Sequence, residues 1–74
     1  MSEITVKSEV TGSVWRVMVQ EGAEVAEDDV LILVESMKME IPIPSPDAGK
    51  IIRVLVNEGD PISEGDPVVV IETA

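Results

Sequence analysis

The sequence predicts an all-β fold, a flattened barrel or sandwich of two small antiparallel sheets with internal pseudo-twofold symmetry. Three observations predict it. The chain is rich in Val and Ile, it nearly repeats itself after half its 74 residues, and no stretch has the length and periodicity of a helix. Because Trp is the only aromatic type and occurs once, branched aliphatic side chains must fill the core.

The repeat divides the chain into residues 4–36 and 41–73, which align without a gap. We therefore expect two like halves to build a single small domain at residues 1–74. The pairs that recur unchanged are Ser8 and Ser45, Gly12 and Gly49, Arg16 and Arg53, Val17 and Val54, Val19 and Val56, Glu21 and Glu58, Gly22 and Gly59, Glu27 and Glu64, Asp29 and Asp66, and Glu35 and Glu72.

Each half predicts two short strands with turns between them. Asp28 stands where the second half has Gly65, and Asp tolerates positive φ better than most residues, so we expect the turn in both halves. Strands this short cannot bury both faces of a sheet within one half, so two sheets must pack face to face. The predicted strands are 14–19, 30–34, 51–56 and 68–71, and the predicted turns are 20–22, 27–29, 57–59 and 64–66.

A proline-rich segment, 41–46, predicts a strand at the edge of a sheet. Pro42, Pro44 and Pro46 alternate with residues that keep their N–H groups, so this strand can donate hydrogen bonds to one neighbour only. The missing donors also discourage aggregation through the free edge. The matching segment, 4–9, has no proline, which leaves its pairing open.

Composition excludes several classes of chemistry. The chain has no Cys and no His, which removes disulfides, thiolate nucleophiles, imidazole bases and the usual zinc ligands. Its formal charge of −10 disfavours nucleic acid and anionic membranes as partners and favours a basic protein. No stretch approaches the roughly 20 apolar residues of a membrane span. We expect a cytoplasmic protein that is a monomer as an isolated domain.

Lys38 lies at the midpoint of the repeat, within Glu35-Ser36-Met37-Lys38-Met39-Glu40. We expect residues 37–39 to form a hairpin turn that carries two methionines, although polar or glycine residues are favoured in such turns. The repeat equivalent of this hairpin is the gap between the chain ends. Lys38 and the termini should therefore lie at opposite ends of the domain.

With these features the sequence resembles the biotinyl/lipoyl attachment domain family over essentially all 74 residues. The resemblance is carried by Glu35-Ser36-Met37-Lys38-Met39-Glu40, by Glu21-Gly22 with Glu58-Gly59, and by Gly49. Biotin carriers of this family have their lysine within Ala-Met-Lys-Met or Ser-Met-Lys-Met, whereas lipoyl domains usually have Asp-Lys-Ala. The chain looks most like the small biotin/lipoyl attachment proteins and the biotin carboxyl carriers of acyl-CoA carboxylases.

The resemblance implies a carrier that is not itself an enzyme. A biotin protein ligase would attach biotin to Lys38, with Met37, Met39 and Glu35 serving its recognition. The biotin arm would then carry carboxylate from a biotin carboxylase to a carboxyltransferase, whose acceptor is an acyl-CoA or a 2-oxo acid. Neither catalytic residues nor a metal site are expected in the chain.

Two other functions stay open from the sequence. One is a lipoyl carrier of a 2-oxo acid dehydrogenase-type complex, with lipoate on Lys38; Met37 and Met39 argue against it. The other is a barrel-sandwich interaction module that carries no prosthetic group. An independent enzyme is least favoured, because no paired acid and base, metal cluster or phosphate-binding loop is visible.

Overall fold

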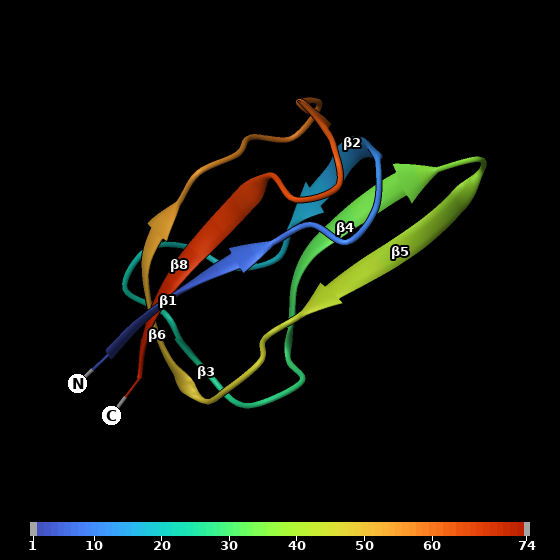
Figure 1. Cartoon of the computed structure of the whole chain (residues 1–74). Coiled ribbons are helices and arrows are strands. Elements are labelled where there is room, and N and C mark those ends of the chain that lie inside the picture. Colours follow the sequence, from blue (N-terminus) through green and yellow to red (C-terminus); the bar gives the residue numbers. More distant parts are fainter. Residues whose placement is uncertain (1, 74) are drawn as a thin grey trace.

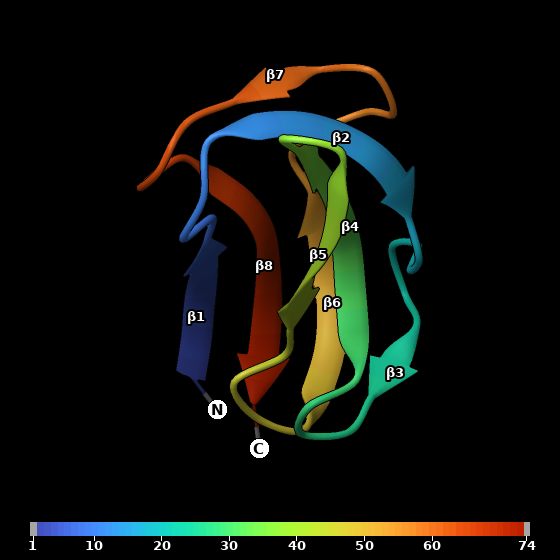
Figure 2. The same cartoon turned by 90° about the vertical axis from the view of Figure 1, so that its right-hand side faces the viewer.

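The computed structural model describes residues 2–73, which form eight strands and no helix (Figures 1 and 2). The strands make two four-stranded antiparallel sheets that do not close into a continuous barrel. The predicted all-β sandwich is therefore confirmed. The strands are β1 Ser2–Lys7, β2 Gly12–Val17, β3 Glu24–Val25, β4 Val30–Ser36, β5 Met39–Pro44, β6 Gly49–Val54, β7 Pro61–Ile62 and β8 Pro67–Thr73.

Each sheet contains strands from both halves of the repeat. Sheet A has the order β1-β8-β6-β3, and sheet B has the order β5-β4-β2-β7. Moving every strand of sheet A to its equivalent in the other half gives sheet B in the same order, which is the pseudo-twofold symmetry expected from the sequence. The exchange of strands between the halves was not predicted.

The core obeys the same symmetry. Its buried side chains come mainly in equivalent pairs from the two halves, and all are aliphatic. Burying such side chains is the main force that holds a small β-sandwich together. Five equivalent pairs are Val6 and Ile43, Val14 and Ile51, Leu31 and Val68, Ile32 and Val69, and Val34 and Ile71.

Backbone hydrogen bonds join the two halves at equivalent points. The N–H of Gly22 donates to the carbonyl of Ile51 at 2.7 Å, and the N–H of Gly59 donates to that of Val14 at 2.8 Å. Gly22 and Gly59 both have φ of 92°, a backbone conformation that residues with a Cβ rarely adopt. The two Glu-Gly turns therefore fasten each half to the other.

The proline-rich segment forms β5, an edge strand of sheet B, as predicted. β5 pairs only with β4, where Pro42 is in register with Leu33 and Pro44 with Val30. The matching strand, β1, pairs in the same way with β8 and is the corresponding edge of sheet A. Both free edges thus occupy equivalent positions, but only β5 has prolines.

The structure differs from the sequence prediction in the strand boundaries. β2 and β6 begin at Gly12 and Gly49 and end at Val17 and Val54, two residues before the predicted ends. The register also shifts beside Trp15 in β2 and beside Ile52 in β6. These bulges break the simple alternation on which the prediction relied. The two-residue strands β3 and β7 were not predicted.

The domain is elongated, with extents of 36 × 17 × 17 Å. The turn between β4 and β5 lies at one end of it, and the start of β1 and the end of β8 lie together at the other end (Figure 1). This confirms the expected placement of the Lys38 turn relative to the termini. Among residues 2–73, no helix is long and apolar enough to cross a membrane.

Candidate functional site: the Lys38 hairpin

Lys38 occupies the second position of a two-residue turn between β4 and β5. Ser36 and Met39 close the turn as a register pair, and the two residues between them, Met37 and Lys38, have φ of 51° and 67°. Positive φ at both central residues is the mark of the type I′ turn, which matches the twist of the two strands. The turn holds the lysine at the tip of a regular hairpin.

This hairpin projects beyond the rest of sheet B (Figure 1). The pairing of β2 with β4 ends at Ser13 and Glu35, so past that point β4 has only β5 as a neighbour. Lys38 is exposed, and Met37 beside it is 94 % exposed. The side chain of Lys38 is therefore open to solvent.

Side-chain hydrogen bonds hold the base of the hairpin on the body of the domain. Ser36 Oγ donates to the carbonyl of Thr11 at 2.9 Å, and Thr11 Oγ1 accepts the N–H of Glu64 at 3.1 Å. Gly12 lies so close to the carbonyl of Glu35 that an added Cβ would overlap it. The last residue of β4 is thus anchored immediately before the turn.

The structure brings the four residues predicted for the site into one hairpin. Met39 opens β5 and is 63 % exposed, so neither methionine is packed into the core. Glu35 lies in β4 directly opposite Glu40 in β5, with both side chains exposed. The roles of Met37, Met39 and Glu35 stay predictions, because position and exposure do not assign a role.

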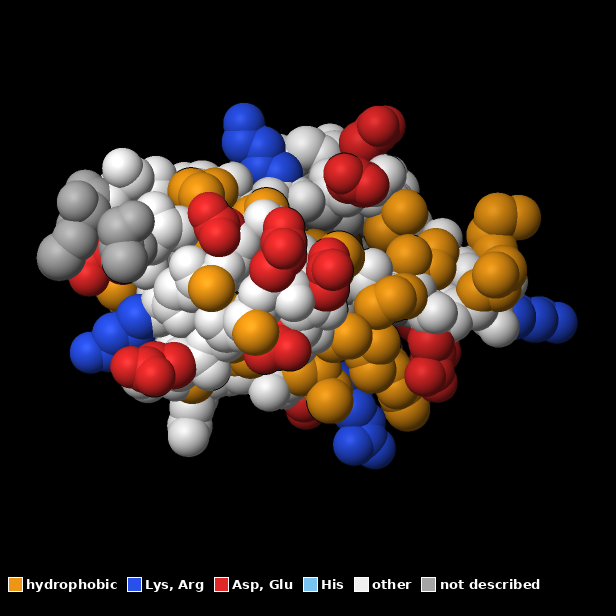
Figure 3. Space-filling view, turned by 90° about the horizontal axis from the view of Figure 1, so that it is seen from below, with side chains coloured by type: hydrophobic (Ala, Val, Ile, Leu, Met, Phe, Trp, Pro, Cys, Tyr) orange, Lys and Arg blue, Asp and Glu red, His pale blue; other side chains and the backbone are white. Residues whose placement is uncertain are grey.

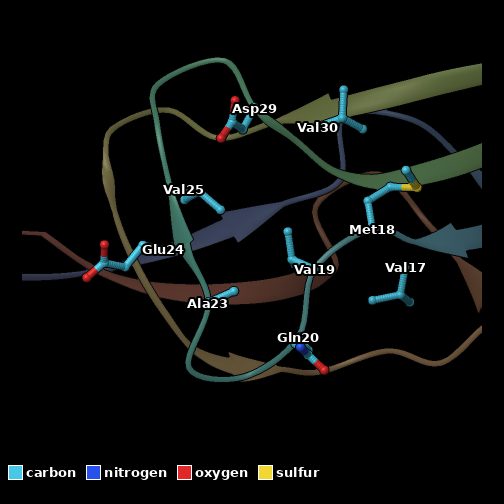
Figure 4. A pocket seen from close by; sticks show the side chains of 9 residues that line it. All are labelled: Val17, Met18, Val19, Gln20, Ala23, Glu24, Val25, Asp29 and Val30. Atoms are coloured by element: carbon cyan, nitrogen blue, oxygen red, sulfur yellow. The ribbon is translucent and has the colours of Figure 1, made fainter.

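Other concave parts of the surface lie away from Lys38. One depression of about 590 Å³ lies at the end of β2, over β3 and at the start of β4 (Figure 4). Its polar side chains include Gln20, Glu24 and Asp29, and Asp29 already accepts the N–H of Ala26 at 2.8 Å. Within residues 2–73, no group of three acidic side chains is arranged to hold a metal ion. The depression has no acid and base pair for catalysis.

Comparison with protein families gives a match over residues 3–71 to the Biotin_lipoyl family, described as "Biotin-requiring enzyme". The chain belongs to the Biotin_lipoyl family. The resemblance inferred from the hairpin motif is confirmed, and the exposed hairpin lies in an attachment domain of this family.

Several relatives of this Biotin_lipoyl domain are named as biotinylated proteins. The chain is 54 % identical over 37 residues to the biotinylated protein TB7.3 homolog of Mycobacterium leprae, and that match covers 50 % of the chain and 52 % of the relative. Biotinylated protein TB7.3 of Mycobacterium tuberculosis is 51 % identical over the same length and coverage. The chain thus spans about half the length of the curated relatives it matches.

Solved structures match nearly the whole Biotin_lipoyl domain. A single-chain, multi-domain long-chain acyl-CoA carboxylase aligns with a TM-score of 0.89 and 34 % identity, over 97 % of this chain and 7 % of that one. The Kluyveromyces lactis urea carboxylase aligns with a TM-score of 0.91 and 32 % identity, over 97 % of this chain and 6 % of that one. The domain is similar to a small part of each carboxylase.

Sequence reasoning missed Thr11, which anchors the hairpin through Ser36. The Ser36 hydroxyl donates to the carbonyl of Thr11, which any residue type would offer, so no side-chain signal in the sequence marks this contact. The Thr11 hydroxyl accepts the N–H of Glu64, and the equivalent residue in the second half, Ala48, has no hydroxyl group.

Proposed function

We propose that the chain is a biotin carboxyl carrier, in which biotin joined to Lys38 moves carboxylate from a biotin carboxylase to a carboxyltransferase. The exposed amine at the tip of the projecting β4–β5 hairpin carries this proposal. The named biotinylated relatives and the carboxylases of similar fold support it. In this proposal the chain supplies no catalytic group of its own.

The residues of the hairpin fit a covalently attached biotin. Lys38 Nζ is a primary amine, and it forms an amide when it displaces AMP from the biotinyl adenylate made by a biotin protein ligase, with loss of one proton from nitrogen. When attached, biotin supplies a ureido ring that carries carboxylate. The Ser36 and Thr11 hydrogen bonds keep the base of the hairpin fixed, so movement is confined to the lysine side chain and what it carries.

The flanking residues serve recognition by the ligase in this proposal. Met37 and Met39 present two flexible thioether side chains beside the amine, and such side chains adapt well to a partner surface. Glu35 lies at the base of the same hairpin and offers a negative charge. The carboxyl acceptor, an acyl-CoA or a 2-oxo acid, binds to the carboxyltransferase in this proposal. No residue of this chain is therefore assigned to acceptor binding.

Intact mass spectrometry tests the proposal after co-expression of the chain with a biotin protein ligase and, separately, with a lipoate ligase. We expect one biotinyl group per chain, located on Lys38 by digestion. Lys38→Arg should abolish the adduct, whereas Lys7→Arg and Lys50→Arg should keep it, because these lysines lie in strands β1 and β6 and not in a turn.

Other outcomes would overturn the proposal in distinct ways. A lipoyl adduct on Lys38 without a biotinyl adduct would make the chain a lipoyl carrier of a 2-oxo acid dehydrogenase-type complex. No adduct from either ligase would leave an unmodified interaction module. A biotinyl group on Lys7 or Lys50 would remove Lys38 from its assigned role.

A further inference from the structure

The outer side of sheet B presents an apolar surface next to the Lys38 hairpin. Leu33 of β4 is in register with Pro42 of β5 and with Arg16 of β2, and Trp15 lies at the bulge next to Arg16. Farther from the hairpin, Val30 is in register with Pro44, and the N–H of Met18 donates to the carbonyl of Leu31, the neighbour of Val30. We call Pro42, Leu33, Trp15, Pro44, Val30 and Met18 the sheet B face. Figure 3 shows apolar side chains gathered over this part of the surface, with a basic side chain at the far tip.

Trp15 is the residue of the sheet B face that the fold explains least. It is the only aromatic residue of the chain, yet it is 43 % exposed, and a bulge in β2 turns it outward between Val14 and Arg16. The equivalent residue in the second half is Ile52, which is less exposed. The guanidinium of Arg16 lies 5.6 Å from the Trp15 ring centroid. Trp and Arg are the side chains that contribute most strongly to protein interfaces.

At the edge of this face two acidic side chains lie opposite each other without a basic residue in register beside them in the described strands. The equivalent acidic pair in sheet A has a lysine beside it. In sheet A, Glu72 lies opposite Glu3 on one side and opposite Lys50 on the other. In sheet B, the equivalent Glu35 lies opposite Glu40, but Ser13 stands at the position that corresponds to Lys50. Two like charges directly opposite each other repel. A basic side chain from a partner would balance this pair as Lys50 does in sheet A.

The position of the face indicates which partner covers it. An enzyme that acylates Nζ of Lys38 must contact the hairpin itself, because the unmodified lysine reaches no farther than its own side chain. The sheet B face and the Glu35–Glu40 pair adjoin that hairpin on its outer side. We propose that the sheet B face docks the ligase that acylates Lys38, with a Lys or Arg of the ligase between Glu35 and Glu40; this inference rests on the proposed function.

Steady-state kinetics with a biotin protein ligase tests the apolar part of the surface. Trp15→Ile introduces the residue that the fold already accepts at position 52. We expect it to raise KM for the carrier about fivefold or more and to change kcat less than about twofold, as for the loss of one interface anchor. The matched control is Leu55→Ala, which shortens the equivalent of Met18 on the outer side of the other half, is 45 % exposed in the native chain, and should leave KM unchanged.

A pair of charge variants separates docking from stability. Ser13→Lys supplies sheet B with the cation that sheet A has, so it should raise Tm and yet raise KM, since the Glu35–Glu40 pair is then already balanced. Lys50→Ser makes the reverse change in sheet A, and it should lower Tm and leave KM unchanged. A purely structural effect would instead raise KM in the variant whose Tm falls, Lys50→Ser, and not in Ser13→Lys.

The outcomes distinguish this inference from the function on which it rests. If the native chain accepts no biotin, the proposed function fails. If the native chain is biotinylated and Trp15→Ile and Ser13→Lys both keep the native KM, the carrier stands and the docking face is wrong.

Discussion

At the residue scale, backbone strain in residues other than glycine is concentrated in the attachment turn. Among residues 2–73, three such residues have positive φ: Asp28, Met37 and Lys38. The conformation costs about 1 kcal/mol for a residue with a Cβ. Asp28 is a residue type that tolerates it, but Met37 and Lys38 are not. Met37 and Lys38 therefore lower the stability of the turn, and we infer that these two residue types serve the function of the hairpin.

Replacing Met37 should separate the effect of this residue on stability from its effect on biotinylation. Met37→Asn places a residue that accepts positive φ at the first position of the turn, so we expect the free energy of unfolding in urea to rise by about 0.5 kcal/mol. We expect the KM of biotinylation to rise as well, because the exposed thioether is lost.

The control for this variant is Asp28→Gly. It relieves backbone strain far from the hairpin, because glycine is the residue at the equivalent position of the second half, Gly65. It should also raise the unfolding free energy, with no change in KM. An unchanged KM in Met37→Asn would exclude Met37 from ligase recognition, and a lower stability would show that the turn is not strained.

At the scale of elements, β5 combines the attachment hairpin with a free edge on which two prolines offer no hydrogen-bond donor. Ile41 and Ile43 are in register with Val34 and Ile32 of β4, and the alternate positions, Pro42 and Pro44, have no N–H. The strand next to the exposed lysine is thus protected from pairing with another chain.

Restoring the donors should remove this protection. We expect the double variant Pro42→Thr with Pro44→Thr to self-associate at high concentration, because the free edge of β5 then offers N–H groups to a second copy. Sedimentation velocity over a concentration series measures this. Pro46→Ser, which adds an N–H beyond the end of β5, should stay like the native chain. Unchanged sedimentation of the double variant would mean that another feature protects the edge.

The sequence predicted most of the strands because they follow composition and the repeat. The type of fold, the edge position of β5 and the exposed Lys38 turn could all be inferred in this way. The bulges beside Trp15 and Ile52 could not, because they depend on the partner strand and not on local pattern. For the same reason Thr11 was missed, since its contacts with Ser36 and Glu64 join segments far apart in the chain.

At the scale of the whole molecule, the two halves are interlocked and do not form separate sheets. Besides the strand pairing, one glutamate in each half accepts a backbone N–H of the other half at equivalent positions. Val17 N–H donates to Glu58 Oε2, and Val54 N–H donates to Glu21 Oε2, both at 3.3 Å. These contacts lie at equivalent positions and span the junction between the halves.

Removing either carboxylate should weaken the junction. We expect Glu21→Ala and Glu58→Ala each to lower the free energy of unfolding by about 0.5–1 kcal/mol, because an N–H loses its acceptor. Glu21→Gln and Glu58→Gln keep an acceptor oxygen and remove the charge, so they should lose less. Chemical denaturation followed by Trp15 fluorescence gives these values. Equal losses for Ala and Gln would assign the effect to charge and not to the hydrogen bond.

The pairing of Ser2 with Thr73 at the end of the domain farthest from Lys38 also sets its mechanical response. A force that pulls the two chain ends apart would act on β1 and β8 one residue pair at a time, so the strands would unzip under a small load. A force between Lys38 and those ends would run along the strands and load many hydrogen bonds at once, in shear. The domain is therefore weak against tension across its ends and stiff against tension on the lysine.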